Sequence, residues 1–185
     1  MSALLLLAML QAPAGGEREI LDSFKQACSR TGDFEAMKAD ASSAGWHAMA
    51  ETADPRIERI TRLGREAVKD SGSSAGATYR RTIGGRELFL VVSRYDDKSG
   101  FWGMGCRLYD FSATKPLDVA TLTKWMGKPP TGVKEPAPGL SQRLWEPGWR
   151  SGVTFEASFV PAGHALAKTF GVHGNVFIAQ AIGGF

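Results

Sequence analysis

Residues that often carry catalysis or bind metals are scarce in this 185-residue sequence, which has two cysteines and three histidines. No Cys-x-x-Cys or His-Glu-x-x-His spacing occurs, so the common zinc motifs are excluded. No stretch approaches the ~20 apolar residues that a membrane-spanning helix needs. Charge of one sign is not dominant either, because 22 Lys and Arg face 19 Asp and Glu. These absences favour a globular chain of ordinary composition that does not span a membrane.

Basic residues recur at every third position of one predicted helix, at Arg56, Arg59, Arg62 and Arg65. Such a series is more typical of a solvated helix face than of a nucleic-acid-binding patch. We therefore expect no nucleic-acid partner. For an exported chain, anionic surfaces of the cell envelope are the more natural counterpart of a mild basic excess.

The first 14 residues predict export. Leu4 to Leu10 is a short apolar run, and Ala12-Pro13-Ala14 then supplies the small residues that a signal peptidase recognises. The run is too short to anchor the chain in a membrane, and no cysteine follows it to carry a lipid. We expect residues 1–14 to be a signal peptide and residues 15–185 to be one periplasmic or secreted domain. An apolar N-terminus on a cytosolic protein remains the alternative, because no Lys or Arg precedes the run.

Apolar periodicity predicts an α+β fold. We expect a largely antiparallel sheet of about six strands in two layers, with three N-terminal helices and one central helix on one face. Residues 71–77, rich in Ser and Gly, are interpreted as a connector. The expected helices cover residues 17–30, 33–44, 55–69 and 117–126, and the expected strands cover 78–83, 86–95, 101–111, 142–146, 153–161 and 175–182.

The two cysteines are predicted to form a structural disulfide. Cys28 lies on the apolar stripe of the first helix, and Cys106 lies on the apolar face of the third strand. A helix buries its stripe against the apolar face of a sheet, so both thiols should point into one interlayer space. In an oxidising compartment two such cysteines usually pair. Two unpaired buried thiols are the alternative, and no neighbouring cation or helix N-terminus marks Cys28 as a nucleophile.

Candidates for catalysis are weak. Gly72 to Gly76 has the letters of the Gly-x-Ser-x-Gly elbow, but a helix precedes it and a strand follows it, the reverse of the order that the elbow requires. His164 and His173 share the connection between the last two strands and are weak candidates for a metal site. A small hydrolase or metal-dependent enzyme using these histidines is therefore the alternative function, and no cofactor is expected.

One face of the third strand is a candidate binding surface. Opposite Cys106, that strand presents Gly103, Gly105, Arg107 and Tyr109. Glycines there would let another group approach the backbone closely. Arg107 offers a charge-assisted donor and Tyr109 an amphipathic ring. The competing interpretation is that the glycines accommodate a bent strand or the proline-rich loop at 129–138.

Two tryptophans are candidates for an interaction surface beside the proline-rich loop and for the rim of that strand face. Trp145 and Trp149 flank a Pro-Gly turn together with Arg143 and Arg150. Trp and Arg are the residue types that interfaces favour. Ordinary packing of a loop against the core is the alternative.

The N-terminal third carries the pattern Phe24-x-x-x-Cys28-x-x-Thr31, followed by Phe34 and Gly45-Trp46. It resembles small exported alphaproteobacterial proteins of unknown function. The resemblance implies export and supplies no activity or catalytic residues. The expected function is therefore that of a non-enzymatic envelope protein that binds a partner protein or a small ligand.

Overall fold

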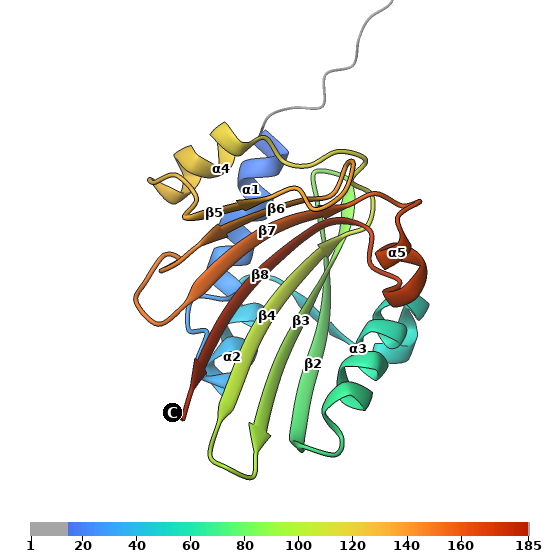
Figure 1. Ribbon diagram of the computed structural model, residues 1–185, viewed down its shortest axis with the longest axis vertical. Helices are drawn as coiled ribbons and strands as arrows, with labels where there is room; N and C mark the ends of the chain where they lie inside the picture. Colours follow the sequence, from blue (N-terminus) through green and yellow to red (C-terminus); the bar gives the residue numbers. More distant parts are fainter. Residues whose placement is uncertain (1–14, 185) are drawn as a thin grey trace, which may run out of the picture.

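A central antiparallel sheet organises the computed structural model, which describes residues 15–184. Within that range the sheet has eight strands in the order β1-β2-β3-β4-β8-β7-β6-β5 (Figure 1). The strands are β1 (His47–Met49), β2 (Gly72–Ile83), β3 (Arg86–Asp97), β4 (Trp102–Asp110), β5 (Gly132–Lys134), β6 (Ser141–Trp145), β7 (Thr154–Val160) and β8 (Gly174–Gly183). The predicted signal peptide, residues 1–14, lies outside the described residues.

Five α-helices accompany the sheet in the described part of the chain, together with the short 3-10 helix η1 (Glu51–Ala53). They are α1 (Gly15–Ala27), α2 (Phe34–Ser43), α3 (Pro55–Val68), α4 (Val119–Met126) and α5 (Ala165–Phe170). Local chemistry sets their ends. The Asp33 and Asp54 carboxylates accept hydrogen bonds from the first backbone N–H groups of α2 and α3, and Gly127 ends α4 in the left-handed conformation.

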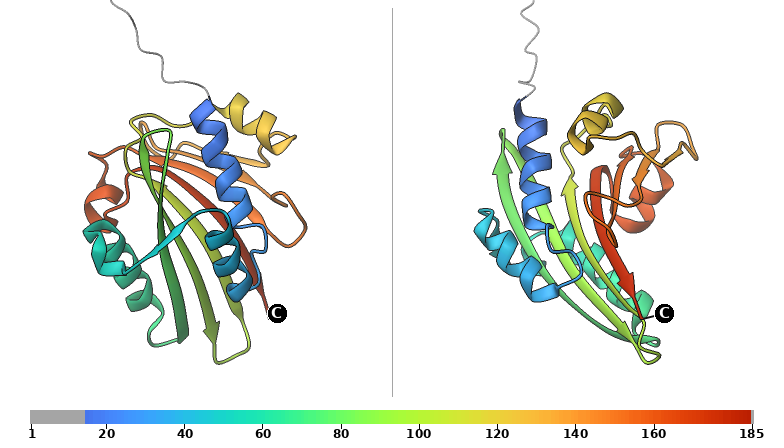
Figure 2. Two further views of the ribbon diagram at one scale, coloured as in Figure 1. Left: turned by 180° about the vertical axis from the view of Figure 1, so that it is seen from behind. Right: turned by 90° about the vertical axis from the view of Figure 1, so that its left-hand side faces the viewer.

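Helices cover both faces of the sheet (Figure 2). The α1, α2 and α4 helices lie on one face, where Phe24, Met37, Leu90 and Phe155 belong to the larger hydrophobic core. On the other face, Ile57 of α3 packs into a smaller core with residues of β3, β4 and β8. The protein therefore has three layers, and only one face of the sheet is fully covered.

The structure confirms an α+β fold with one antiparallel sheet and corrects several details. Eight strands and five helices replace the six and four expected, because β1, β5 and α5 are too short to show a periodicity. The expected two-layer arrangement is wrong because α3 lies on the second face. The expected connector at 71–77 is also wrong, since Gly72 begins β2 and pairs with Asp97 of β3.

The Cys28–Cys106 pair is confirmed. Their sulfur atoms are 2.04 Å apart, their Cα atoms are 5.8 Å apart, and both side chains are completely buried. The bond joins the segment that follows α1 to the middle of β4, across the larger core. Among residues 15–184, no helix is long and apolar enough to cross a membrane.

Candidate ligand-binding cavity

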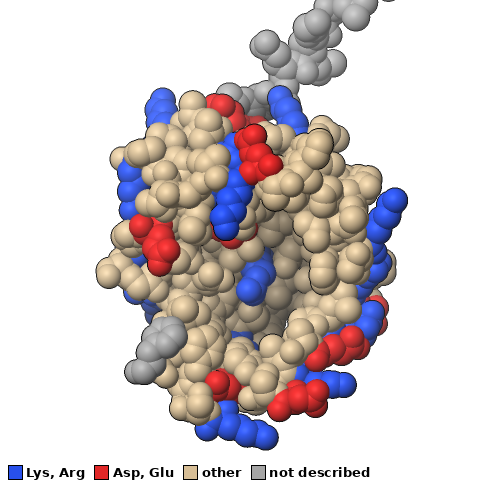
Figure 3. Space-filling view, viewed as in Figure 1, with Lys and Arg blue, Asp and Glu red and all other residues tan. Residues whose placement is uncertain are grey.

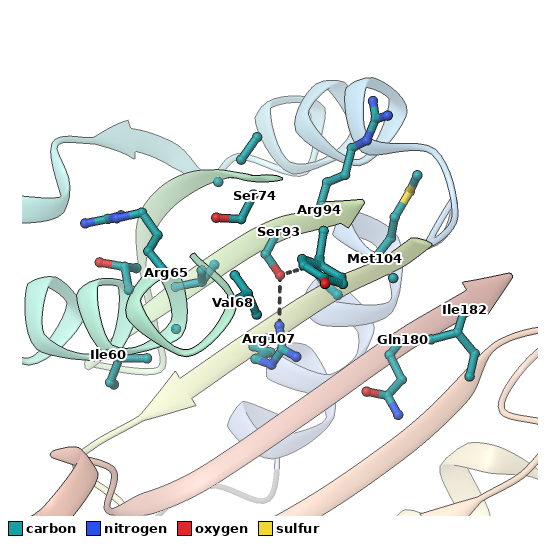
Figure 4. Close-up of a pocket in the computed structure, with 18 of the residues that line it drawn as sticks. Ile60, Arg65, Val68, Ser74, Ser93, Arg94, Met104, Arg107, Gln180 and Ile182 are labelled. Atoms are coloured by element: carbon teal, nitrogen blue, oxygen red, sulfur yellow. Dashed lines mark hydrogen bonds between the residues drawn. The ribbon is translucent and has the colours of Figure 1, made fainter. Parts of the chain in front are cut away.

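A cavity of about 480 Å³ lies between α3 and the second face of the sheet. Its lining comes from α3, β2, β3, β4 and β8, and apolar atoms make up most of it (Figure 4). Figure 3 shows the hollow on the surface of this face, with basic atoms at its base and mostly uncharged atoms around them. Arg107 and Tyr109 are both among the lining residues.

The floor of the cavity is deep because small residues lie side by side across the strands. Gly76 of β2 pairs with Ser93 of β3, and Ser93 pairs with Gly105 of β4. Gly103, two residues along β4, also lacks a side chain on this face. The proline-rich loop at 129–138 contributes nothing to the lining, so the glycines are not sealed beneath it.

The α3 helix forms one wall without packing tightly on the sheet. The sequence predicts that Ile57, Ile60, Gly64 and Val68 are buried along one stripe, and this is right only for Ile57. Ile60 and Val68 are half-buried and line the cavity, while Gly64 is exposed to it. The helix is therefore anchored at its N-terminal end, and the rest of its apolar stripe faces an open space.

Arg107 supplies the charge at the floor. Its side chain is half-buried, and Nη1 donates a hydrogen bond to the Ser93 hydroxyl oxygen at 2.9 Å (Figure 4). No carboxylate of the described residues forms an ion pair with it. The other two arginines of the lining differ, because Arg65 pairs with Glu51 and Arg94 pairs with Asp96.

Tyr109 closes one end of the floor as part of the second core. It is 3 % exposed, and its ring stacks on Phe111 with centroids 5.7 Å apart. Burial raises the pKa of the Tyr109 hydroxyl, while the positive charge of Arg107 acts in the opposite direction. The hydroxyl therefore stays protonated at neutral pH. The Tyr109 ring therefore forms part of the cavity wall and is not exposed as a stacking surface for a ligand.

Neither predicted tryptophan lies at the rim. Trp145 is completely buried in the larger core, and its indole N–H donates to the Lys128 carbonyl oxygen at 3.0 Å. Trp149 is half-buried against Phe24 and Phe155 in the same core. Both lie on the opposite face of the sheet from Arg107. The assignment of Trp145 and Trp149 to the rim of this surface is therefore wrong, and ordinary packing explains them.

The two candidate histidines have local partners instead of a shared site. His164 caps α5, its Nδ1 accepting from the Leu166 backbone N–H at 3.2 Å. The His173 ring packs against Phe111 at 5.2 Å between centroids. The described residues contain no group of three or more His, Cys, Asp or Glu placed to hold a metal.

Several lining residues were not predicted from the sequence. Ser93 could have been found, because strand alternation places it on the same face as Val91 and Tyr95. Ile182 also carries a signal, since a large apolar side chain that is 55 % exposed is unusual at the end of a strand. No sequence pattern predicted that Gly64 and Val68 would lie near these residues, because their position depends on which face of the sheet α3 covers.

Comparison of the chain with protein-family models, with curated proteins and with solved structures finds no match. The candidate site therefore rests on its own geometry.

Proposed function

We propose that this protein is an exported, non-enzymatic binding protein that holds a small, largely apolar molecule between α3 and the sheet. The observation that carries the proposal is the cavity of about 480 Å³. Small-molecule sites are typically concave, mostly apolar, and roughly 300–1,000 Å³ in volume, with few polar groups. The cavity has these properties, and Gly76 and Gly103 add no side chains to its floor.

Export is supported by two features. The apolar run at Leu4 to Leu10 has the length and the following small residues of a signal peptide. A buried disulfide between Cys28 and Cys106 is typical of an oxidising compartment such as the periplasm. The ligand would then be a small molecule of the cell envelope or its surroundings.

Filling the cavity from α3 tests the proposal. A Cβ added at Gly64 meets no heavy atom within 4 Å, so Gly64→Leu projects a side chain into open space. The same change removes a glycine from a helix interior, which stabilises a helix by about 1 kcal/mol. We expect the wild type to bind the neutral dye N-phenyl-1-naphthylamine with increased fluorescence. The Gly64→Leu variant should melt at a higher temperature and bind the dye at least about tenfold more weakly.

The matched control is Ala67→Leu, which adds an apolar side chain to an exposed position of α3 outside the lining. It should bind the dye as the wild type does. Absence of dye binding by the wild type would overturn the proposal. Equal binding by the folded Gly64→Leu variant would do the same.

A further inference from the structure

The cavity holds a positive charge that the protein does not balance. The Arg107 guanidinium has five N–H donors, and the one hydrogen bond it makes within residues 15–184 goes to the neutral Ser93 hydroxyl. The remaining donors are not sealed within the protein, since the buried atoms without a hydrogen-bond partner do not include them, and Arg107 lines the cavity. An anionic group entering the cavity would supply the opposite charge and accept from these donors.

The other charged groups of the lining are already satisfied. Glu51 is its one acidic residue, and its carboxylate accepts from the Arg65 guanidinium and the Thr61 hydroxyl. Arg94 forms two hydrogen bonds with Asp96, and in Figure 4 its guanidinium points away from Arg107. One uncompensated positive charge therefore remains, and it lies at the floor of the cavity.

The backbone beneath Arg107 makes room for this arrangement. A Cβ built at Gly105 would lie within contact distance of the Arg107 guanidinium, which extends over that glycine. Any side chain at position 105 would displace the guanidinium. The absence of a side chain at Gly105 therefore allows the guanidinium to lie here, and the hydrogen bond to Ser93 orients it.

From these contacts we infer that the ligand is an amphipathic monocarboxylate. Its carboxylate binds Arg107, and its apolar body lies against Ile60, Val68 and Ile182. The inference rests on the proposed binding function and specifies its ligand class. A single guanidinium flanked by a neutral hydroxyl balances one negative charge and can bind a carboxylate through two parallel hydrogen bonds. A phosphate monoester with two charges would need a second cation, and Arg65 and Arg94 are already paired.

Three ligands with the same ten-carbon chain and different heads test the inference. Decanoate, decanol and decyltrimethylammonium are titrated into the full chain by calorimetry, at neutral pH and below their micelle concentrations. We expect decanoate to bind most tightly and decyltrimethylammonium most weakly. Arg107→Met, which keeps an unbranched side chain and removes the charge, should weaken decanoate binding by about 10- to 100-fold. It should leave decanol binding within about threefold of wild type.

Decanol binding by Arg107→Met also reports that this variant is folded. The matched control is Arg80→Met, which removes the same charge from an exposed position of β2 outside the lining. Arg80→Met should retain the preference for decanoate. If wild type binds decanol and decanoate equally, or if Arg107→Met keeps the preference, the inference is overturned and the binding function stands. If none of the three ligands binds and the neutral dye does not either, the binding function itself is overturned.

Discussion

At the scale of single residues, the site depends on the absence of a side chain at one position of β4. Gly105 has no side chain, and the Arg107 guanidinium occupies the space that a Cβ would fill. Ser93, from the neighbouring strand, accepts one of its hydrogen bonds. The glycine leaves space for this long, flexible cation, and the Ser93 hydroxyl orients it. Such preorganisation lowers the entropic cost of binding an anion.

Gly105→Ala should displace the Arg107 guanidinium without changing the charge of the protein. We expect decanoate affinity to fall by about tenfold, equivalent to ~1.4 kcal/mol, while decanol affinity changes much less. Gly103→Ala is the control, because a Cβ there meets Ile182 Cγ2 at 3.7 Å, an ordinary contact. Calorimetric titration of both variants with both ligands checks this. Equal losses of decanoate affinity in the two variants would contradict the displacement.

Sequence patterns predicted some residues of this site and missed or misplaced others. Particular residues show the physical reason. Alternation along one strand was enough to place Gly103, Gly105, Arg107 and Tyr109 on one face. It could not show that Tyr109 is buried, because the side chains that cover it include Ile57 of α3 and Phe89 of β3, which come from other parts of the chain. Trp145 was misplaced for a similar reason, since a tryptophan beside a turn has the same local signal whether its ring faces the solvent or the core.

At the scale of elements, α3 is the part that makes the cavity possible. Its N-terminal end is fixed by Ile57 in the second core and by Arg56, whose guanidinium lies 4.4 Å from the centroid of the Phe111 ring. Asp54 caps the helix and also pairs with Arg56. Because the contacts of α3 with the second core lie at this end, the remainder of the helix can stand over the cavity without closing it.

The Asp54 cap should give the stability of the protein a specific pH dependence. The side-chain hydrogen bond from Arg56 holds the pKa of the Asp54 carboxyl below its usual range, and backbone N–H groups add to this effect against the opposing effect of burial. A lowered pKa means that the stabilisation is complete above the unfolded-state value, about 3.9, and is lost as the pH falls through the folded-state value.

Asp54→Asn keeps a capping side chain and removes the charge. Its free energy of unfolding should be lower than that of wild type by about 1–2 kcal/mol at neutral pH, and the difference should disappear in acid. Urea denaturation across that pH range measures it. Asp118→Asn, at the cap of α4, is the control; the Asp118 carboxylate accepts from Thr121 and forms no ion pair in the described structure, so the loss should be smaller. A difference for Asp54→Asn that is independent of pH would contradict the assigned role of the charge.

Helices and strands were predicted correctly where a long stretch of sequence shows a regular apolar period. Prediction failed where pairing with another strand decides the structure. The helices at α1 to α4 follow from their apolar spacing and caps. The residues from Gly72 to Ala77 resemble a linker in isolation, and they become a strand because β3 offers twelve paired positions along its whole length. Which face α3 covers could not be predicted, because an amphipathic helix packs equally well on either apolar face.

At the scale of the whole molecule, one covalent bond joins the segment after α1 to the centre of the sheet. The Cys28–Cys106 bond spans 78 positions of sequence, and both ends are buried. In the chain-entropy model, closing a loop of this length stabilises the folded state by about 4–5 kcal/mol. Cys106 points into the larger core, away from the cavity, so the bond supports the fold without forming part of the cavity lining.

Replacing both cysteines should therefore separate stability from binding. We expect Cys28→Ser combined with Cys106→Ser to lower the free energy of unfolding by about 2–5 kcal/mol. Decanol and decanoate should still bind at a temperature where the variant is folded. Thermal melts and titrations on the same preparation test both statements. An unchanged melting temperature would show that the bond contributes little.

Export makes a prediction that can be checked on the intact cell. Fractionation should recover the chain outside the cytoplasm, with a mature N-terminus near Gly15, because the small residues Ala12 and Ala14 precede it. N-terminal sequencing of the purified protein identifies that end. Recovery of an intact Met1 in the cytosol would contradict export and leave the disulfide without an oxidising compartment.

The alternation of side chains along β4 has a consequence for how the sequence can vary. Cys106 and Leu108 face the sealed core, whereas Gly105 and Arg107 face the cavity. Selection for a folded protein acts on the first pair, and under the proposed function selection for the ligand would act on the second. A saturation mutagenesis screen scored separately for cellular abundance and for ligand capture should therefore show two interleaved tolerance profiles from Gly105 to Leu108. Under the proposed function, substitutions at Gly105 and Arg107 would change the preferred ligand while the core residues Cys106 and Leu108 stayed the same.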